Sequence, residues 1–101
     1  MSKDNETGEY SIFENRDEGR FELHHDDEIL SIANFSERSG GIVVIPHVET
    51  SPAHRGQGNA GRLMDGVLKL LRDTDRKVVP LCPFAAQHVR SNPQYADLVA
   101  N

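Results

Sequence analysis

The sequence has one cysteine, no tryptophan and no long apolar run among its 101 residues. A single cysteine, Cys82, cannot form a disulfide within the chain, which is typical of a reducing compartment and predicts a cytoplasmic location. No apolar run approaches the ~18 residues that a membrane-spanning helix needs. The first residues also lack the apolar segment of a secretory signal. We therefore expect neither a membrane protein nor a secreted one.

Basic residues are scarce at the beginning of the chain. Residues 1–28 carry ten acidic and three basic side chains, a net charge of −7, whereas residues 29–101 carry six and eight, a net charge of +2. Residues 1–10 are polar and contain almost no large aliphatic side chain. They are predicted to be a disordered acidic tail before a single domain over residues 11–101. The mild charge of that domain does not favour a polyanionic partner, so we expect no nucleic-acid binding.

Hydrophobic periodicity predicts a mixed α/β fold of the α+β kind. Alternating apolar residues predict three antiparallel strands within residues 19–28, 29–38 and 41–50. A stripe with helical spacing predicts a first main helix over residues 58–73. Residues 77–82 then form a fourth strand, which the intervening helix allows to run parallel to the third, and residues 83–91 a second main helix. The prediction is a mostly antiparallel sheet with one β-α-β crossover.

Two prolines predict irregular points in this sheet. Pro46 interrupts the third strand and indicates a bulge or a break in its hydrogen bonding. Pro80 cannot donate to a neighbouring strand, so the fourth strand is expected at an edge or separated from its neighbour at that residue. Because an exposed edge can pair with a second copy, we expect a monomer or a weak homodimer.

Gly56, Gly58 and Gly61 form the pattern G-x-G-x-x-G immediately before the first predicted helix. Backbone N–H groups at a helix start have no intrahelical partner, and glycine lets an anion approach them closely. Arg55 adds a permanent cation with a planar guanidinium. The pattern predicts a diphosphate-binding loop, although a glycine-rich turn before a core helix would have the same sequence.

Three kinds of phosphate-bearing ligand compete for this loop. A nucleoside triphosphate loop needs a lysine directly after its last glycine, and none is present here. A dinucleotide fingerprint needs an acidic residue at the end of the next strand, whereas this strand ends in PLCP. Coenzyme A remains, with a nucleotide-binding domain as the alternative that tight NAD or ATP binding would favour.

The segment PAHRGQGNAGRL, residues 52–63, resembles the acetyl-CoA loop of the GNAT acetyltransferase superfamily, whose pattern is [RQ]-x-x-G-x-[GA]. Arg55, Gly58 and Ala60 occupy its three specified positions. The similarity extends over residues 21–99, and HVET, PLCPF and NPxYxxLV resemble a small single-domain, YjdJ-like branch. The resemblance implies a GNAT-like fold, acetyl-CoA as cofactor, and transfer of acetyl to an amine of a small molecule or a protein. The alternative is a CoA-binding module without acceptor chemistry of its own.

The same resemblance implies which residues bind the cofactor. The third and fourth strands should separate, so that the backbone near Val48 and Thr50 pairs with the pantetheine arm, while Asn92 and Tyr95 lie near its thiol end. Asn92 and Tyr95 are equally well read as a helix stop and a core aromatic. We expect the chain to lack the segments that usually wall the acceptor site. The diphosphate is expected on the backbone amides of Arg55, Gly56, Gln57, Gly58, Asn59 and Ala60.

Three residues are candidates for the chemistry. Cys82 immediately precedes a helix start, where a thiolate is stabilised, so it is either a reactive thiol near the cofactor or a small buried core residue. His47 and Glu49 are two residues apart on one strand and leave the same face. Either can take a proton from an amine, or both form a solvated polar pair.

The remaining histidines are not predicted to bind a metal. His24 and His25 are adjacent on a strand and point to opposite faces, so with the acidic residues 26–28 they indicate a solvated turn. His54 is expected on the surface beside the glycine loop. His88 lies on the second helix, where the sequence shows no partner for it.

Overall fold

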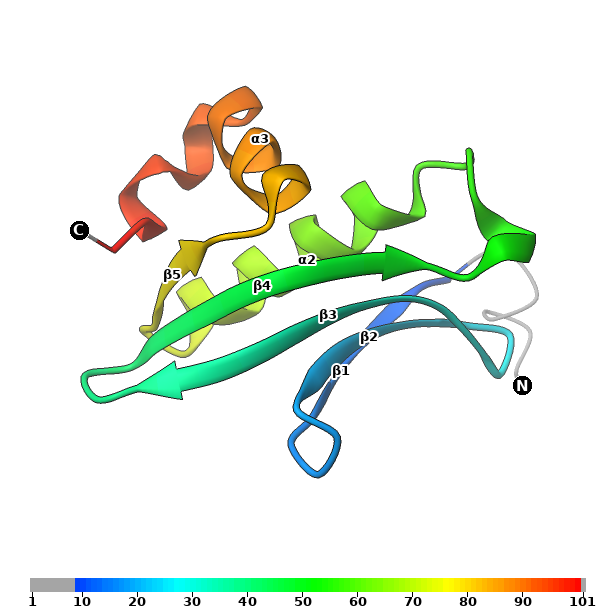
Figure 1. Ribbon diagram of the computed structural model, residues 1–101, viewed down its shortest axis with the longest axis horizontal. Helices are drawn as coiled ribbons and strands as arrows, with labels where there is room; N and C mark the ends of the chain where they lie inside the picture. The colour runs from blue at the N-terminus through cyan, green and yellow to red at the C-terminus, as the bar shows by residue number, and fades with distance from the viewer. Residues whose placement is uncertain (1–8, 101) are drawn as a thin grey trace.

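Four antiparallel strands form a meander, and a fifth strand returns parallel to the fourth (Figure 1). The computed structural model describes residues 9–100. The predicted mixed sheet with one β-α-β crossover is confirmed, and its strand order is β1-β2-β3-β4-β5. None of the helices within residues 9–100 is long and apolar enough to cross a lipid bilayer. The elements are β1 (Ser11–Asn15), β2 (Arg20–His25), β3 (Glu28–Arg38), β4 (Ile42–Thr50), the 3₁₀ helix η1 (Pro52–His54), α2 (Asn59–Asp73), β5 (Lys77–Pro80), α3 (Pro83–Ser91) and the 3₁₀ helix η2 (Pro93–Leu98).

Strand β1 is an addition that the sequence did not predict, so four strands rather than three precede the glycine loop. It pairs with β2 from Ser11 opposite His24 to Asn15 opposite Arg20. Its alternation is only five residues long, too short to distinguish from a polar loop. The predicted tail of residues 1–10 lies outside the described residues except for Glu9 and Tyr10. The Tyr10 ring stacks on His25 with a centroid distance of 4.4 Å.

Helix α2 lies across one face of the sheet and supplies most of the core on that side (Figure 1). Its predicted range of 58–73 is confirmed, with Gly58 as the N-cap residue. Fully burying an aliphatic side chain of this size stabilises the fold by about 1.5–3 kcal/mol. The apolar stripe packs against side chains from β2, β3 and β4, and its buried members are Leu63, Met64, Val67, Leu68 and Leu71.

Strands β4 and β5 pair over only four residues and then separate. Their parallel register runs from Ile42 opposite Lys77 to Ile45 opposite Pro80. Ile45 and Pro46 together lie opposite one residue of β3, which is a β-bulge, so the prediction from Pro46 is confirmed. The prediction from Pro80 is also confirmed, because β5 is an edge strand that ends there. Residues 47–50 of β4 continue beyond the bulge paired with β3 alone.

Candidate functional site

The loop between β4 and α2 is held in one conformation by side chains of the helix that follows it. The Asn59 amide donates to the carbonyl of His54 at 3.1 Å. The Arg62 guanidinium donates to the carbonyl of Gln57 and to Oδ1 of Asn59, both at 2.8 Å. Asn59 is only 3% exposed, so its bond to His54 lies beneath the loop, whereas the bond from Arg62 to Gln57 is exposed.

The first turn of α2 carries unpaired backbone donors. The N–H of Arg62 bonds to the carbonyl of Gly58 at 3.1 Å, but within residues 9–100 the N–H groups of Asn59, Ala60 and Gly61 have no acceptor. Gly58 has a φ of +79°, in the left-handed region that favours glycine. The free amides of this first turn and the positive end of the helix dipole are therefore directed at the loop.

A hollow of about 340 Å³ lies against this turn, between the glycine loop and α3. Phe84 of α3 is 42% exposed and forms its opposite wall, a contribution that the sequence analysis missed. A large apolar residue in the first turn of a helix, directly after PLCP, was the available signal. Other lining residues are Thr50, His54, Arg55, Gly56, Gly58, Asn59, Ala60 and Gly61.

Arg55 lies at the edge of this hollow, as the sequence predicted for the cation of the loop. Its Nε donates to the carbonyl of Thr50 at 3.3 Å, which ties the loop to the end of β4. Within the described part of the chain the two terminal nitrogens of Arg55 have no acceptor. His54 lies beside the loop, where Nε2 is 3.1 Å from Oε1 of Glu28.

Cys82 occupies the point where β5 and β4 diverge. It is the N-cap residue of α3 and is 7% exposed within the core beneath α2. Its N–H donates to the carbonyl of Ile45, the first residue of the bulge, at 3.0 Å. Cys82 therefore packs in the core, and it also lies next to the gap between β4 and β5.

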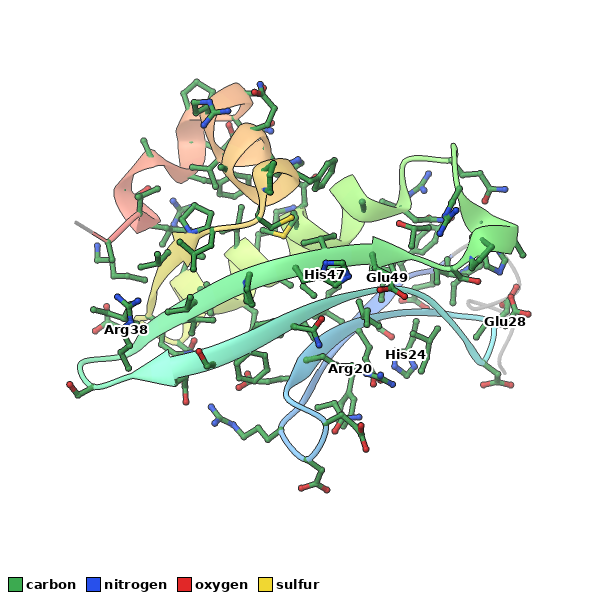
Figure 2. The ribbon with its side chains drawn as sticks, viewed as in Figure 1. Arg20, His24, Glu28, Arg38, His47 and Glu49 are labelled. Atoms are coloured by element: carbon green, nitrogen blue, oxygen red, sulfur yellow. The ribbon has the colours of Figure 1, made fainter. Side chains whose placement is uncertain are left out.

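His47 and Glu49 point from the face of the sheet opposite α2, which we call the open face (Figure 2). Nε2 of His47 lies 2.8 Å from Oε1 of Glu49, so the predicted common face is confirmed. Both side chains are more than half exposed. Val48 between them packs against the core. The pair of His47 and Glu49 therefore lies on the open face, whereas Cys82 lies on the other side of the gap between β4 and β5.

Asn92 lies at the opposite end of α3 from Cys82, a distance of about 15 Å along the axis of this nine-residue helix. Its side-chain amide donates to the carbonyl of His88 at 2.7 Å, and its carbonyl accepts the N–H of Tyr95. Both bonds terminate the helix. A role for Asn92 near the cofactor stays a prediction.

His88 has a partner, so its description from the sequence as partnerless was wrong. Its Nε2 lies 2.8 Å from Oδ1 of Asp65 on α2, and the Tyr95 hydroxyl donates to the same oxygen at 3.1 Å. Tyr95 is 2% exposed and is a core aromatic. Burial and the hydrogen bond to Asp65 raise the pKa of the Tyr95 phenol. Only the packing of α2 against α3 brings these residues together.

His24 and His25 separate as their adjacent positions on β2 require. Nε2 of His24 lies 2.7 Å from Oε1 of Glu22 on the open face. His25 stacks on Tyr10. Across residues 9–100, no group of three His, Cys, Asp or Glu side chains is arranged to hold a metal ion.

A family model described as GCN5-related N-acetyl-transferase matches residues 20–98. The chain belongs to this acetyltransferase family. The match covers the sheet from β2 onwards, the glycine loop, both main helices and η2. Membership of the YjdJ-like branch stays a prediction.

Solved structures show the same fold for the family. A GCN5-like protein of Staphylococcus aureus, solved by NMR in solution, superposes with a TM-score of 0.67 at 21% identity, covering 90% of this chain and 88% of that one. N-acetylglutamate synthase of Neisseria gonorrhoeae, solved with coenzyme A and N-acetylglutamate, gives a TM-score of 0.56 at 16% identity, covering 86% of this chain. The chain spans only 22% of that synthase. Among curated protein sequences, none matches this chain significantly.

Proposed function

We propose that the chain binds acetyl-CoA at the start of α2 and transfers its acetyl group to an amine of a small molecule or a protein. The observation that carries the proposal is the set of unpaired N–H groups of Asn59, Ala60 and Gly61 beside a hollow. A diphosphate satisfies such donors and the helix dipole together. Membership of the acetyltransferase family supports coenzyme A as its carrier.

The loop has room for the group. A Cβ built at Gly56 would meet nothing within 4 Å, and one at Gly58 would meet only the tip of the Arg62 side chain, at 3.9 Å. The free nitrogens of Arg55 add a fork that matches phosphate oxygens. In this proposal the diphosphate lies on the amides of Arg55, Gly56, Gln57, Gly58, Asn59 and Ala60.

The edge of β4 beyond the bulge is the proposed binding place for the pantetheine arm. Residues 47–50 have no strand partner on the β5 side, so the backbone groups of Val48 and the N–H of Thr50 are open to an extended ligand, while the Thr50 carbonyl already accepts Nε of Arg55. The arm would then lead from the loop towards the gap beside Cys82. Asn92, at the far end of α3 from that gap, stays a prediction from the family resemblance.

Acetyl-CoA supplies an activated acetyl group, so that an amide bond forms to the acetyl carbon as the carbon–sulfur bond breaks and free CoA thiol leaves. An amine becomes a nucleophile only after it loses a proton. In this proposal His47 accepts that proton, and Glu49, whose Oε1 lies 2.8 Å from Nε2 of His47, holds its ring and stabilises the imidazolium that results.

Titration of acetyl-CoA into the purified chain by isothermal calorimetry tests the binding site. Gly58→Leu should remove measurable binding because a side chain would stand in front of the free amides. Gly40→Leu is the matched control, because Gly40 has a φ of +85° and the same backbone cost far from the loop, in the β3–β4 turn. Equal affinity of the two variants would contradict the proposed site. Binding without CoA release across a broad amine panel would favour the alternative, a CoA-binding module.

A further inference from the structure

Two rows of side chains cross the open face of the sheet in register. The first row runs from Arg20 on β2 through Asn34 on β3 to His47 on β4. The second runs from Glu22 through Ile32 to Glu49. Figure 2 shows Arg20, His47 and Glu49 along this face. The proposed proton acceptor thus shares a surface with a cation two strands away.

Glu22 is a buried carboxylate with three donors. Its side chain is 3% exposed. Oε2 accepts the Asn15 amide at 2.9 Å and Nε of Arg20 at 2.8 Å, and Oε1 lies 2.7 Å from Nε2 of His24. Burial alone raises the pKa of Glu22, but the bonds from Arg20, His24 and Asn15 outweigh it and hold that pKa below its usual value. A buried charge that is paired in this way holds its partners in place.

Glu22 fixes the orientation of Arg20 but does not bond the two terminal nitrogens of its guanidinium, which we call the Arg20 fork. The only side-chain hydrogen bond that Arg20 makes within residues 9–100 is through Nε, which leaves both terminal nitrogens without an acceptor. The side chain is 29% exposed, so these nitrogens are accessible from outside. A guanidinium fixed at Nε presents two parallel N–H donors, the geometry that binds a carboxylate in bidentate fashion.

A hollow of about 230 Å³ is lined both by Arg20 and by Glu49, the residue that lies 2.8 Å from the proposed proton acceptor His47. Ile29 and Ile32 add apolar lining to the same hollow. The hollow therefore combines a cation, an apolar floor and a carboxylate. A ligand complementary to it carries an anion at one end and a cation at the other.

We propose, on the basis of the acetyl transfer proposed above, that the acceptor is an amino acid whose carboxylate binds the Arg20 fork while its amine lies against His47 and Glu49. Arg20 and His47 lie in one row two strands apart, which places their backbones about 10 Å from each other on the same face. The apolar floor then contacts the amino-acid side chain.

The test compares amino acids with their carboxamides, which keep the amine and lose the carboxylate. Binding is followed through the NMR signal of the Arg20 Nε–H in the full chain, with glycine, alanine, leucine, β-alanine and the matching carboxamides as probes. We expect at least one amino acid to shift this signal and its carboxamide to bind at least tenfold more weakly. Equal binding of each pair, or binding by neither member of any pair, overturns the proposal. β-Alanine reports whether a longer spacing between amine and carboxylate is preferred.

Two variants separate the fork from the fold. Arg20→Lys keeps a cation beside Glu22 but lacks the fork, so it should reduce the preference for the carboxylate at least fivefold. Arg38→Gln, at the far end of β3, is the control and should change nothing. Thermal unfolding verifies that both variants are folded.

CoA release measured in parallel distinguishes a failure of the amino-acid acceptor proposal from a failure of the acetyl-transfer proposal on which it rests. Release with carboxamides as fast as with amino acids would overturn the amino-acid acceptor and leave acetyl transfer intact. Carboxylate-dependent binding without CoA release from any amine would overturn acetyl transfer and leave the Arg20 amino-acid site standing.

Discussion

The backbone N–H of Cys82 donates to the carbonyl of Ile45 at 3.0 Å, and the N–H of Leu81 donates to the same oxygen at the same distance. The Ile45 carbonyl, at the bulge of β4, therefore accepts hydrogen bonds from the last two backbone N–H groups before α3. No further pairing follows between the two strands, since β5 ends at Pro80. This shared acceptor is the point at which the sheet opens, and the proposed cofactor path depends on it.

Arg55→Ala should weaken acetyl-CoA binding by about 1–3 kcal/mol, the usual contribution of a hydrogen bond to a charged group. The free nitrogens of Arg55 lie beside the loop amides, but the amides themselves remain in the variant. Calorimetry measures the change, with Arg38→Ala as the control at the far end of the sheet. An unchanged dissociation constant would exclude a contact between Arg55 and the diphosphate.

Cys82→Ser should lower acetyl transfer more than acetyl-CoA binding. The thiol lies beside the gap between β4 and β5, while the loop proposed to hold the diphosphate is formed by other residues. Serine preserves the size of the buried side chain, so unfolding midpoints are expected to stay close. Steady-state CoA release and calorimetry together check the split. Wild-type turnover in the serine variant would assign Cys82 to packing alone.

A covalent role for Cys82 has a separate test. Intact-mass spectrometry after incubation with acetyl-CoA would show an acetyl adduct that is absent in Cys82→Ser if the thiol accepts the group. We expect direct transfer to the amine, and hence no adduct. Detection of one on Cys82 would replace direct transfer with a two-step route.

Arg76 should make the stability of the fold sensitive to acid. Its guanidinium bonds Glu14 of β1 at 2.8 Å and Glu37 of β3 at 3.0 Å. The bond from Arg76 lowers the pKa of Glu14, and bonds from Arg16 and Arg76 lower that of Glu37. Because these carboxyls are more acidic in the folded state, their stabilisation is complete above the unfolded value of 4.5 and is lost as pH falls through the folded values.

Glu14→Gln should accordingly cost about 1–2 kcal/mol at pH 7, at the lower end for a charged hydrogen bond because the pair is partly exposed. The difference from wild type should shrink at pH 3, because below 4.5 the unfolded chain binds a proton at this carboxyl more tightly than the folded chain does. Urea unfolding at both values measures it. Glu18→Gln is the control, an exposed carboxylate without an ion pair in the described part of the chain. A difference that persists unchanged at pH 3 would contradict the ionic explanation.

Gly66→Ala should destabilise the chain although alanine is the better helix former. A Cβ at Gly66 would overlap Cγ1 of Ile12, which packs onto α2 from β1. Overpacking of this kind costs about 1–3 kcal/mol, against a gain of about 1 kcal/mol from helix propensity. In an Ile12→Ala background the overlap is gone, so Gly66→Ala should then be neutral or stabilising. Denaturation of the four proteins of this double-mutant cycle gives the coupling.

Several features of the site could be predicted from the sequence because they are local. The free amides follow from glycines directly before a periodic helix, and the bulge follows from a proline inside an apolar strand. His47 and Glu49 share a face because they are two residues apart on a strand. The family motif spans six consecutive residues. Each of these signals depends on neighbours in the chain.

Other features depend on residues that meet only after folding. In the sequence, Glu22 is one polar residue of an alternating strand, but in the structure three donors from two strands make it a buried anion. His88 showed no partner in the sequence because Asp65 lies 23 residues earlier. Strand β1 was not predicted for the same reason, because its one aliphatic side chain, Ile12, packs against Gly66 of α2, which is distant in the sequence.

The amino-acid sequence by itself determined the order of the strands and main helices from β2 onwards, the glycine loop and the bulge in β4, because periodicity, glycine and proline act over a few residues. Only the tertiary structure decided where the sheet opens, which side chains share the open face and how Arg20 is held. Those properties depend on strand register and on burial, and a shift of one residue in register would turn each of these side chains to the opposite face.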